Sequence, residues 1–171
     1  MRHSMNLQAT QQQFLDLLNE HKRILYKLAY VHCRRTEDRK DLIQEMLIQL
    51  WRSYESFDGR VKFSTWLYRV AANTAISFYR HEHHAGQETI SIDDIGFDIE
   101  AADSVFGESN ESMQILRSLI DQMDELNSTL ILLYLDGYSH EDIASTIGIS
   151  VSNVGTRINR IKQKLKESLK E

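Results

Sequence analysis

The sequence predicts an all-α protein made of two small helical domains joined by a flexible acidic linker. Apolar residues recur at helical spacing in both end regions, whereas residues 82–110 lose that period and gain glycines, serines and acids. The chain contains no proline, so we expect the linker to bend freely. We place the domains at residues 1–82 and 112–171, with the linker at residues 83–111.

Charge is distributed very unevenly along the chain. Residues 1–80 carry 13 Lys and Arg against 8 Asp and Glu, and residues 81–116 carry nine acids and no Lys or Arg. From Arg157 to Lys170 there are six basic residues and one acid. The net charge of −5 therefore conceals two basic regions that flank an acidic one, which favours nucleic-acid binding by both domains.

The composition is that of a folded, soluble protein, with 42% hydrophobic and 26% charged residues. No apolar run approaches the roughly 20 residues that span a bilayer. No secretory leader opens the sequence, and the lone Cys33 cannot form an internal disulfide. We therefore expect a cytoplasmic protein.

The amino-terminal region predicts three or more helices around one core. Three segments show apolar residues at helical spacing, beginning at Phe14, Leu42 and Phe63. A short loop with Gly59 separates the second segment from the third and spans residues 57–62.

Residues 63–81 are predicted to form a helix in which aromatic and cationic side chains are mixed together. At 100° per residue, one face is apolar and should be buried. The opposite face carries Thr65, Tyr68, Arg69, Ala72, Asn73, Ile76 and Arg80. Exposed rings that stack on bases and cations that follow the backbone are typical of single-strand binding. For Trp66, core packing is the preferred interpretation over a base contact.

The carboxy-terminal region predicts a helix-turn-helix. Ser139 and Asp142 make a capping box, Gly148 ends a short helix, and Ser150 can cap a second one. We expect buried faces formed by Ile143, Ala144 and Ile147, and by Val151, Val154, Ile158, Ile161 and Leu165. The outer face of the second helix suits base edges and phosphates. A plain helical hairpin is the alternative, but it needs neither the paired serine caps nor small residues at the corner between the helices.

An enzyme is a weaker interpretation. His81, His83 and His84 are adjacent in a segment predicted to be flexible, whereas metal ligands need fixed placement. No nucleophile, base and orienting residue occur at a suggestive spacing. We therefore expect neither catalysis, nor a metal, nor any cofactor.

Two stretches in order resemble one family. "DLIQEMLIQLWRSYESFDGRVKFSTWLYRVAANTAI" and "LILLYLDGYSHEDIASTIGISVSNVGTRINRIKQKL" are similar to the extracytoplasmic-function sigma factors of bacterial RNA polymerase. The resemblance covers residues 10–81 and 113–168. It implies domains two and four of a sigma subunit. Its partners would be core polymerase, promoter DNA as duplex and melted strand, and an anti-sigma factor.

The resemblance also implies roles for individual residues. Core polymerase would be bound by Asp41, Gln44, Glu45, Gln49 and Arg52. The melted minus-ten strand would meet Phe57, Arg60, Lys62, Phe63, Ser64, Trp66, Tyr68, Arg69, Asn73 and Arg80, with Asn73 lining a pocket for a flipped base. The minus-thirty-five duplex would meet Ser152, Asn153, Gly155, Thr156, Arg157, Asn159 and Arg160.

Some positions depart from the family pattern. Gly155 stands where the family often has Lys or Arg, Ser77 where an acid is frequent, and Glu125-Leu126-Asn127 where Leu-Pro commonly opens the second domain. These departures affect which promoter sequence we expect the protein to recognise, more than they affect the expected function. The alternative function is a stand-alone helix-turn-helix regulator with a helical sensing domain, which would bind promoter DNA tightly without polymerase.

Overall fold

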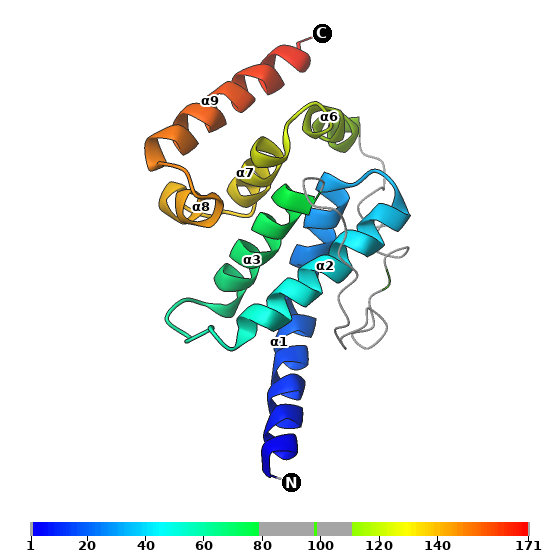
Figure 1. Ribbon diagram of the computed structural model, residues 1–171. Coiled ribbons are helices and arrows are strands. Elements are labelled where there is room, and N and C mark those ends of the chain that lie inside the picture. The colour runs from blue at the N-terminus through cyan, green and yellow to red at the C-terminus, as the bar shows by residue number, and fades with distance from the viewer. Residues whose placement is uncertain (1, 79–97, 99–110, 171) are drawn as a thin grey trace.

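The computed structural model describes residues 2–78, 98 and 111–170, and within them the side chains of residues 10–78, 98 and 115–170 (Figure 1). Each regular element of these described residues is an α-helix. The predicted all-α class is therefore confirmed.

The amino-terminal helices are α1 (Arg2–His32), α2 (Thr36–Tyr54) and α3 (Phe63–Ser77). They pack on one another in all three pairings, and their apolar faces form the core that the sequence predicts. The loop before α3 turns at Gly59, whose φ of 74° lies in the left-handed region that glycine adopts without strain.

The carboxy-terminal helices are α6 (Glu111–Ile120), α7 (Glu125–Leu135), α8 (His140–Ile147) and α9 (Val151–Ser168). Asp124 caps α7, because its Oδ1 accepts a hydrogen bond of 2.7 Å from the backbone of Asn127.

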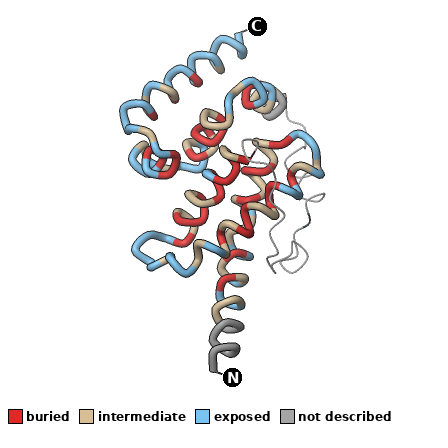
Figure 2. The backbone as a smooth tube through the Cα atoms, viewed as in Figure 1, coloured by how far each residue is buried: buried red, intermediate tan, exposed pale blue. Residues whose placement is uncertain are grey.

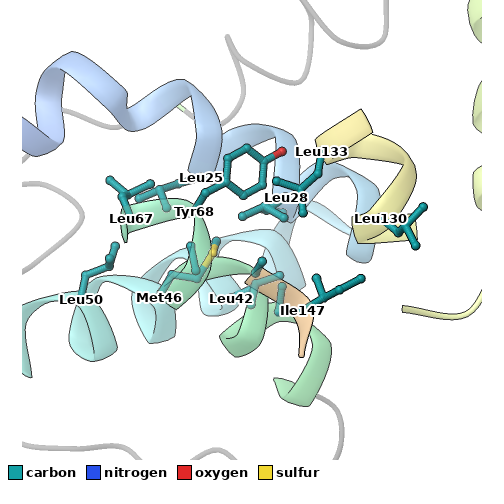
Figure 3. Close-up of a cluster of buried hydrophobic side chains, with 14 of the residues drawn as sticks. Leu25, Leu28, Leu42, Met46, Leu50, Leu67, Tyr68, Leu130, Leu133 and Ile147 are labelled. Carbon is teal, nitrogen blue, oxygen red and sulfur yellow. The ribbon is translucent and has the colours of Figure 1, made fainter. Parts of the chain in front are cut away.

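The two groups of helices share one continuous core. Helix α7 packs against α1 and α3, and α8 packs against α3. Buried residues run through the seam between the groups (Figure 2). Leu130 and Leu133 of α7 and Ile147 of α8 belong to the same cluster as Leu25 and Leu28 of α1 (Figure 3). Helical spacing alone did not predict this closed arrangement.

Polar contacts also join α1 to the carboxy-terminal helices. The guanidinium of Arg117 lies 4.2 Å from the centre of the Tyr30 ring and donates to the Tyr30 carbonyl. Asp121 forms ion pairs with Arg117 at 3.1 Å and with Arg34 at 3.8 Å. The seam is therefore held by both packing and polar contacts.

Candidate nucleic-acid interface

Two serine caps fix the helices of the predicted helix-turn-helix. The backbone N–H groups of Asp142 and Asn153 donate to the Oγ atoms of Ser139 and Ser150, each at 3.1 Å. Between the helices, Gly148 has a φ of 74°, which suits a glycine at a helix carboxyl end. Both caps and the corner are confirmed.

The buried faces of α8 and α9 agree with the prediction at most positions. Val154, Ile158 and Ile161 are buried, as are all three predicted positions of α8. Val151 was predicted to be buried and is 43% exposed, because it begins α9 at the corner, before the turns that pack on α8. Leu165 is only partly buried.

The outer face of α9 presents small polar side chains followed by a cation. Five of the seven predicted duplex-contacting residues are exposed, namely Ser152, Asn153, Thr156, Asn159 and Arg160. Gly155 and Arg157 are partly buried. Hydrogen-bonding groups near the start of such a helix can meet base edges, and arginines can meet phosphates.

Arg157 has a structural contact that periodicity did not predict. Its Nη1 donates to Asn127 Oδ1 at 2.9 Å, and its Nε donates to Asn153 Oδ1 at 3.0 Å. Asn127 is held in turn by Asp124 at 3.1 Å. Arg157 therefore ties α9 to the start of α7. The spacing of Asp124 and Asn127 is typical of a helix start, but it gives no sign of the contact with Arg157.

The predicted polymerase-binding residues lie together on α2. Asp41 and Arg52 are exposed, whereas Gln44, Glu45 and Gln49 are partly buried. The Gln49 amide donates to Glu45 Oε1 at 3.0 Å, one helical turn away. This side of α2 can therefore offer a polar surface to a protein partner.

Aromatic rings gather where α2, the loop and α3 meet. The centroid of Phe57 lies 5.6 Å from that of Phe63 and 5.2 Å from that of Trp66. Trp66 is 9% exposed, which confirms its expected place in the core. Arg60 and Lys62 are exposed, and Arg60 pairs with Asp58 at 3.0 Å. The loop thus combines packed aromatic side chains with exposed cationic ones.

The predicted exposure of Tyr68 is wrong. Its side chain is fully buried, because α7 and the turn after it cover this side of α3. The ring lies 5.3 Å from that of Tyr138, edge to face, and the hydroxyl donates to Asp136 Oδ2 at 3.2 Å. Ala72, placed on the same outer face, is also buried. Burial and the Asp136 carboxylate both raise the pKa of Tyr68, so it stays protonated.

Three other residues of the predicted minus-ten set also contact the covering helices. Arg69 Nη2 donates to Ser145 Oγ at 2.8 Å, and the Asn73 amide donates to the Thr146 carbonyl at 3.1 Å. Ser64 hydrogen-bonds the hydroxyl of Tyr138, whose pKa is raised chiefly by burial. Asn73 nevertheless remains exposed.

Lys27 and Asp136 were not singled out from the sequence. The Lys27 Nζ lies 2.6 Å from Asp136 Oδ1, which makes a salt bridge between α1 and the residue after α7. Asp136 lies within the second stretch quoted in the sequence analysis, but Lys27 lies outside both stretches, and no local signal indicated that the two residues pair.

The acidic linker and its neighbourhood fall largely outside the described residues. Arg80 and the three histidines at positions 81, 83 and 84 lie there too. Asp98 is described, and its backbone hydrogen-bonds the Tyr26 side chain of α1. Burial is the main cause of the raised pKa of Tyr26.

Comparisons with known proteins match both groups of helices. The family described as Sigma-70 region 2 matches residues 17–84, and Sigma-70 region 4 matches residues 113–165. The ECF RNA polymerase sigma factor SigW of Bacillus subtilis is 29% identical, covering 94% of this chain and 91% of its own. The ECF RNA polymerase sigma-E factor of Haemophilus influenzae is 32% identical, covering 77% of this chain and 75% of its own. The chain belongs to the extracytoplasmic-function sigma factors.

Solved structures show the same fold for this sigma factor. The sigma factor RpoE of Bartonella quintana, crystallised with the anti-sigma factor NepR, superposes with a TM-score of 0.62 at 18% identity, covering 94% of this chain and 96% of its own. CnrH, solved with the cytosolic domain of CnrY, gives a TM-score of 0.56 at 24% identity, covering 96% and 94%.

The family establishes the general function. The sigma factor directs promoter-specific initiation by RNA polymerase, and its carboxy-terminal helix-turn-helix is the region-four DNA-binding module. Its relatives are sigma factors, a class of proteins that are not enzymes. Among the described residues, no helix has the length and apolar character needed to cross a membrane, and no three His, Cys, Asp or Glu side chains converge as metal ligands would.

Proposed function

We propose that this sigma factor divides promoter recognition between its two groups of helices. The polar side of α2 binds core polymerase. The loop before α3, together with α3, receives an unpaired base of the minus-ten element, with Asn73 reading its polar edge. The outer face of α9 enters the major groove at the minus-thirty-five element. In this scheme residues 1–82 act as domain two and residues 112–171 as domain four.

The observation that carries this proposal is the capped corner between α8 and α9. Ser139 caps the start of α8, Gly148 and Ser150 form the corner from which α9 begins, and the exposed side of α9 holds Asn153, Thr156 and Arg160. A plain helical hairpin needs neither the paired serine caps nor the small residues at the corner. The arrangement supports groove entry by α9.

The remaining parts of the proposal concern the linker, the cellular compartment and catalysis. The nine acids between residues 81 and 116 would follow polymerase channels that otherwise hold nucleic acid, because their charge resembles that of a phosphate chain. The protein would act in the cytoplasm, where polymerase and promoters meet. It would perform no catalysis of its own.

An anti-sigma factor is a further proposed partner. The Bartonella quintana relative was solved with one, and its fold matches nearly the whole of this chain. Copurification of this sigma factor from its host, followed by identification of bound protein, tests the proposal.

Transcription in vitro provides the main test. Purified sigma factor is added to bacterial core polymerase and genomic DNA, and transcript starts are sequenced. We expect new start sites that share elements near minus ten and minus thirty-five. Unaltered start sites would contradict the proposal. In gel shifts, specific promoter binding should require core polymerase, whereas tight binding by the free protein would favour a stand-alone regulator.

A further inference from the structure

A partly exposed carboxylate at the seam receives donors from two different helices. Asp136 accepts from Lys27 Nζ of α1 at 2.6 Å through one oxygen and from Tyr68 OH of α3 at 3.2 Å through the other. We propose that Lys27 and Tyr68 form a phosphate-binding site for the melted promoter strand, which Asp136 occupies while the seam is closed. This inference rests on the proposed function, because it assumes that α3 meets that strand.

The chemistry of the site fits a phosphate. A lysine ammonium binds phosphate oxygens as a point charge, and a hydroxyl supplies a directed second bond. Burial and Asp136 keep Tyr68 protonated, so its hydroxyl remains a donor. The Tyr68 hydroxyl points toward α7 in Figure 3. An anionic oxygen therefore satisfies both donors.

Removal of Asp136 alone would leave these donors without an acceptor. Tyr68 is fully buried, and a buried polar group without a partner is costly. Lys27 and Asp136 side chains are 25% and 21% exposed, and they lie in the wall of a pocket of about 220 Å³ between α1, α6 and α7. Opening of the seam would thus favour replacement of the carboxylate by another anion from solvent.

The same replacement of a protein acceptor by a nucleic-acid acceptor applies to the next two donors along α3. Arg69 donates to the Ser145 hydroxyl and Asn73 to the Thr146 carbonyl, so α3 supplies the donors and α8 the acceptors. A nucleic-acid strand offers matching acceptors as phosphate oxygens and base edges. Asp136, Ser145 and Thr146 therefore compete with the strand for one surface, and the free protein is held in a state that binds DNA poorly.

Full-length variants and a fluorescein-labelled single-stranded DNA of mixed sequence test the inference by fluorescence anisotropy. Asp136→Asn removes the charge that occupies the site, and we expect binding about tenfold tighter than wild type. Asp121→Asn is the matched control. It removes the same charge from another acid of the seam, one that faces Arg34 and Arg117, and should change binding by less than about twofold.

Two double variants locate the site. In the Asp136→Asn background, Lys27→Gln should remove most of the gain and reduce the salt slope by about 0.7, the value for one phosphate on a single strand. Tyr68→Phe keeps the ring and removes the hydroxyl, so it should also reduce the gain while thermal unfolding confirms a folded chain. Binding by Asp136→Asn no tighter than that of Asp121→Asn, or an unchanged salt slope with Lys27→Gln, would overturn the inference.

Transcription with bacterial core polymerase separates the two proposals. If wild type initiates at new sites and the Lys27→Gln single variant opens promoters equally well, the phosphate site is wrong and the proposed function stands. If no version of the protein alters initiation, the proposed function itself is wrong.

Discussion

The Nε2 atom of His32, at the end of α1, lies 2.8 Å from the Oγ1 atom of Thr129 in α7. This contact joins residues that are 97 positions apart in the chain. The other ring nitrogen, Nδ1, is buried without a hydrogen-bond partner among the described residues. Burial lowers the pKa of His32 to about 4, against a weaker opposing effect of Glu125. The seam therefore holds a neutral imidazole.

This pKa predicts that acid weakens the closed arrangement. Between pH 6.5 and about 4 the opened or unfolded state binds a proton that the closed state excludes, so stability is complete above pH 6.5 and falls as the pH approaches 4. The loss should reach about 3.5 kcal/mol at most, at about 1.4 kcal/mol per pKa unit.

Fluorescence transfer between labels on α1 and α9, measured from pH 7.5 to pH 4, checks this prediction. His32→Asn, which keeps a neutral polar group, is the control and should lose most of the pH dependence. An equal slope in both proteins would show that another group is responsible.

Asn73→Ala should impair promoter opening more than polymerase binding. The amide is expected to read a flipped base, and loss of one such hydrogen bond costs roughly threefold to tenfold. Permanganate reactivity of unpaired thymines measures opening, and anisotropy measures polymerase binding. Ser77→Ala is the control, since among the described residues its hydroxyl bonds only to carbonyls of its own helix. Equal losses of opening and binding in Asn73→Ala would count against the base pocket.

The two arginines of α9 should behave differently when each is replaced by alanine. Arg160 is exposed, so Arg160→Ala should lower the salt slope of upstream duplex binding by about 0.9 without a change in stability. Arg157 ties α9 to Asn127, so Arg157→Ala should also cost about 1 kcal/mol of stability. Salt titrations and urea unfolding measure the two effects. A slope that is unchanged in Arg160→Ala would remove this residue from the phosphate contacts.

Two glycines of the helix-turn-helix predict opposite changes in stability. Gly155 lies within α9, and an added Cβ would come no closer than 3.8 Å to the His140 ring, so Gly155→Ala should stabilise by about 1 kcal/mol. Gly148 has a φ of 74°, so Gly148→Ala should destabilise by roughly 1 to 2 kcal/mol. Urea unfolding measures the stability of both variants. If both changes had the same sign, one of the two predictions would be wrong.

The features that the sequence predicted well are local ones. Ser139 and Asp142 are three residues apart, and so are Ser150 and Asn153, so each cap is complete within one turn. The burial of Trp66 follows from helical spacing because its own neighbours α1 and α2 form the core around it. Helix positions, caps and the amino-terminal core could therefore be derived without a structure.

The features that escaped prediction depend on distant segments. Tyr68 and Asn73 share one helical face, yet only Tyr68 is buried, because Asp136 and Tyr138 cover it from about 70 positions away. Spacing along one helix shows which side is polar, but it does not show which other helix will lie on that side. The hydrogen bond between Arg157 and Asn127 escaped prediction for the same reason.

The shared core also limits the lifetime of a molecule in which the two groups of helices have separated. Leu130, Leu133 and Ile147 are buried together with Leu25 and Leu28, so separation of the two groups would uncover leucine-rich surface on both. We expect such a chain to become a substrate for chaperones and proteases within the cell unless polymerase covers that surface at once. Turnover of the sigma factor would then rise when core enzyme is scarce, which couples its abundance to the supply of its partner.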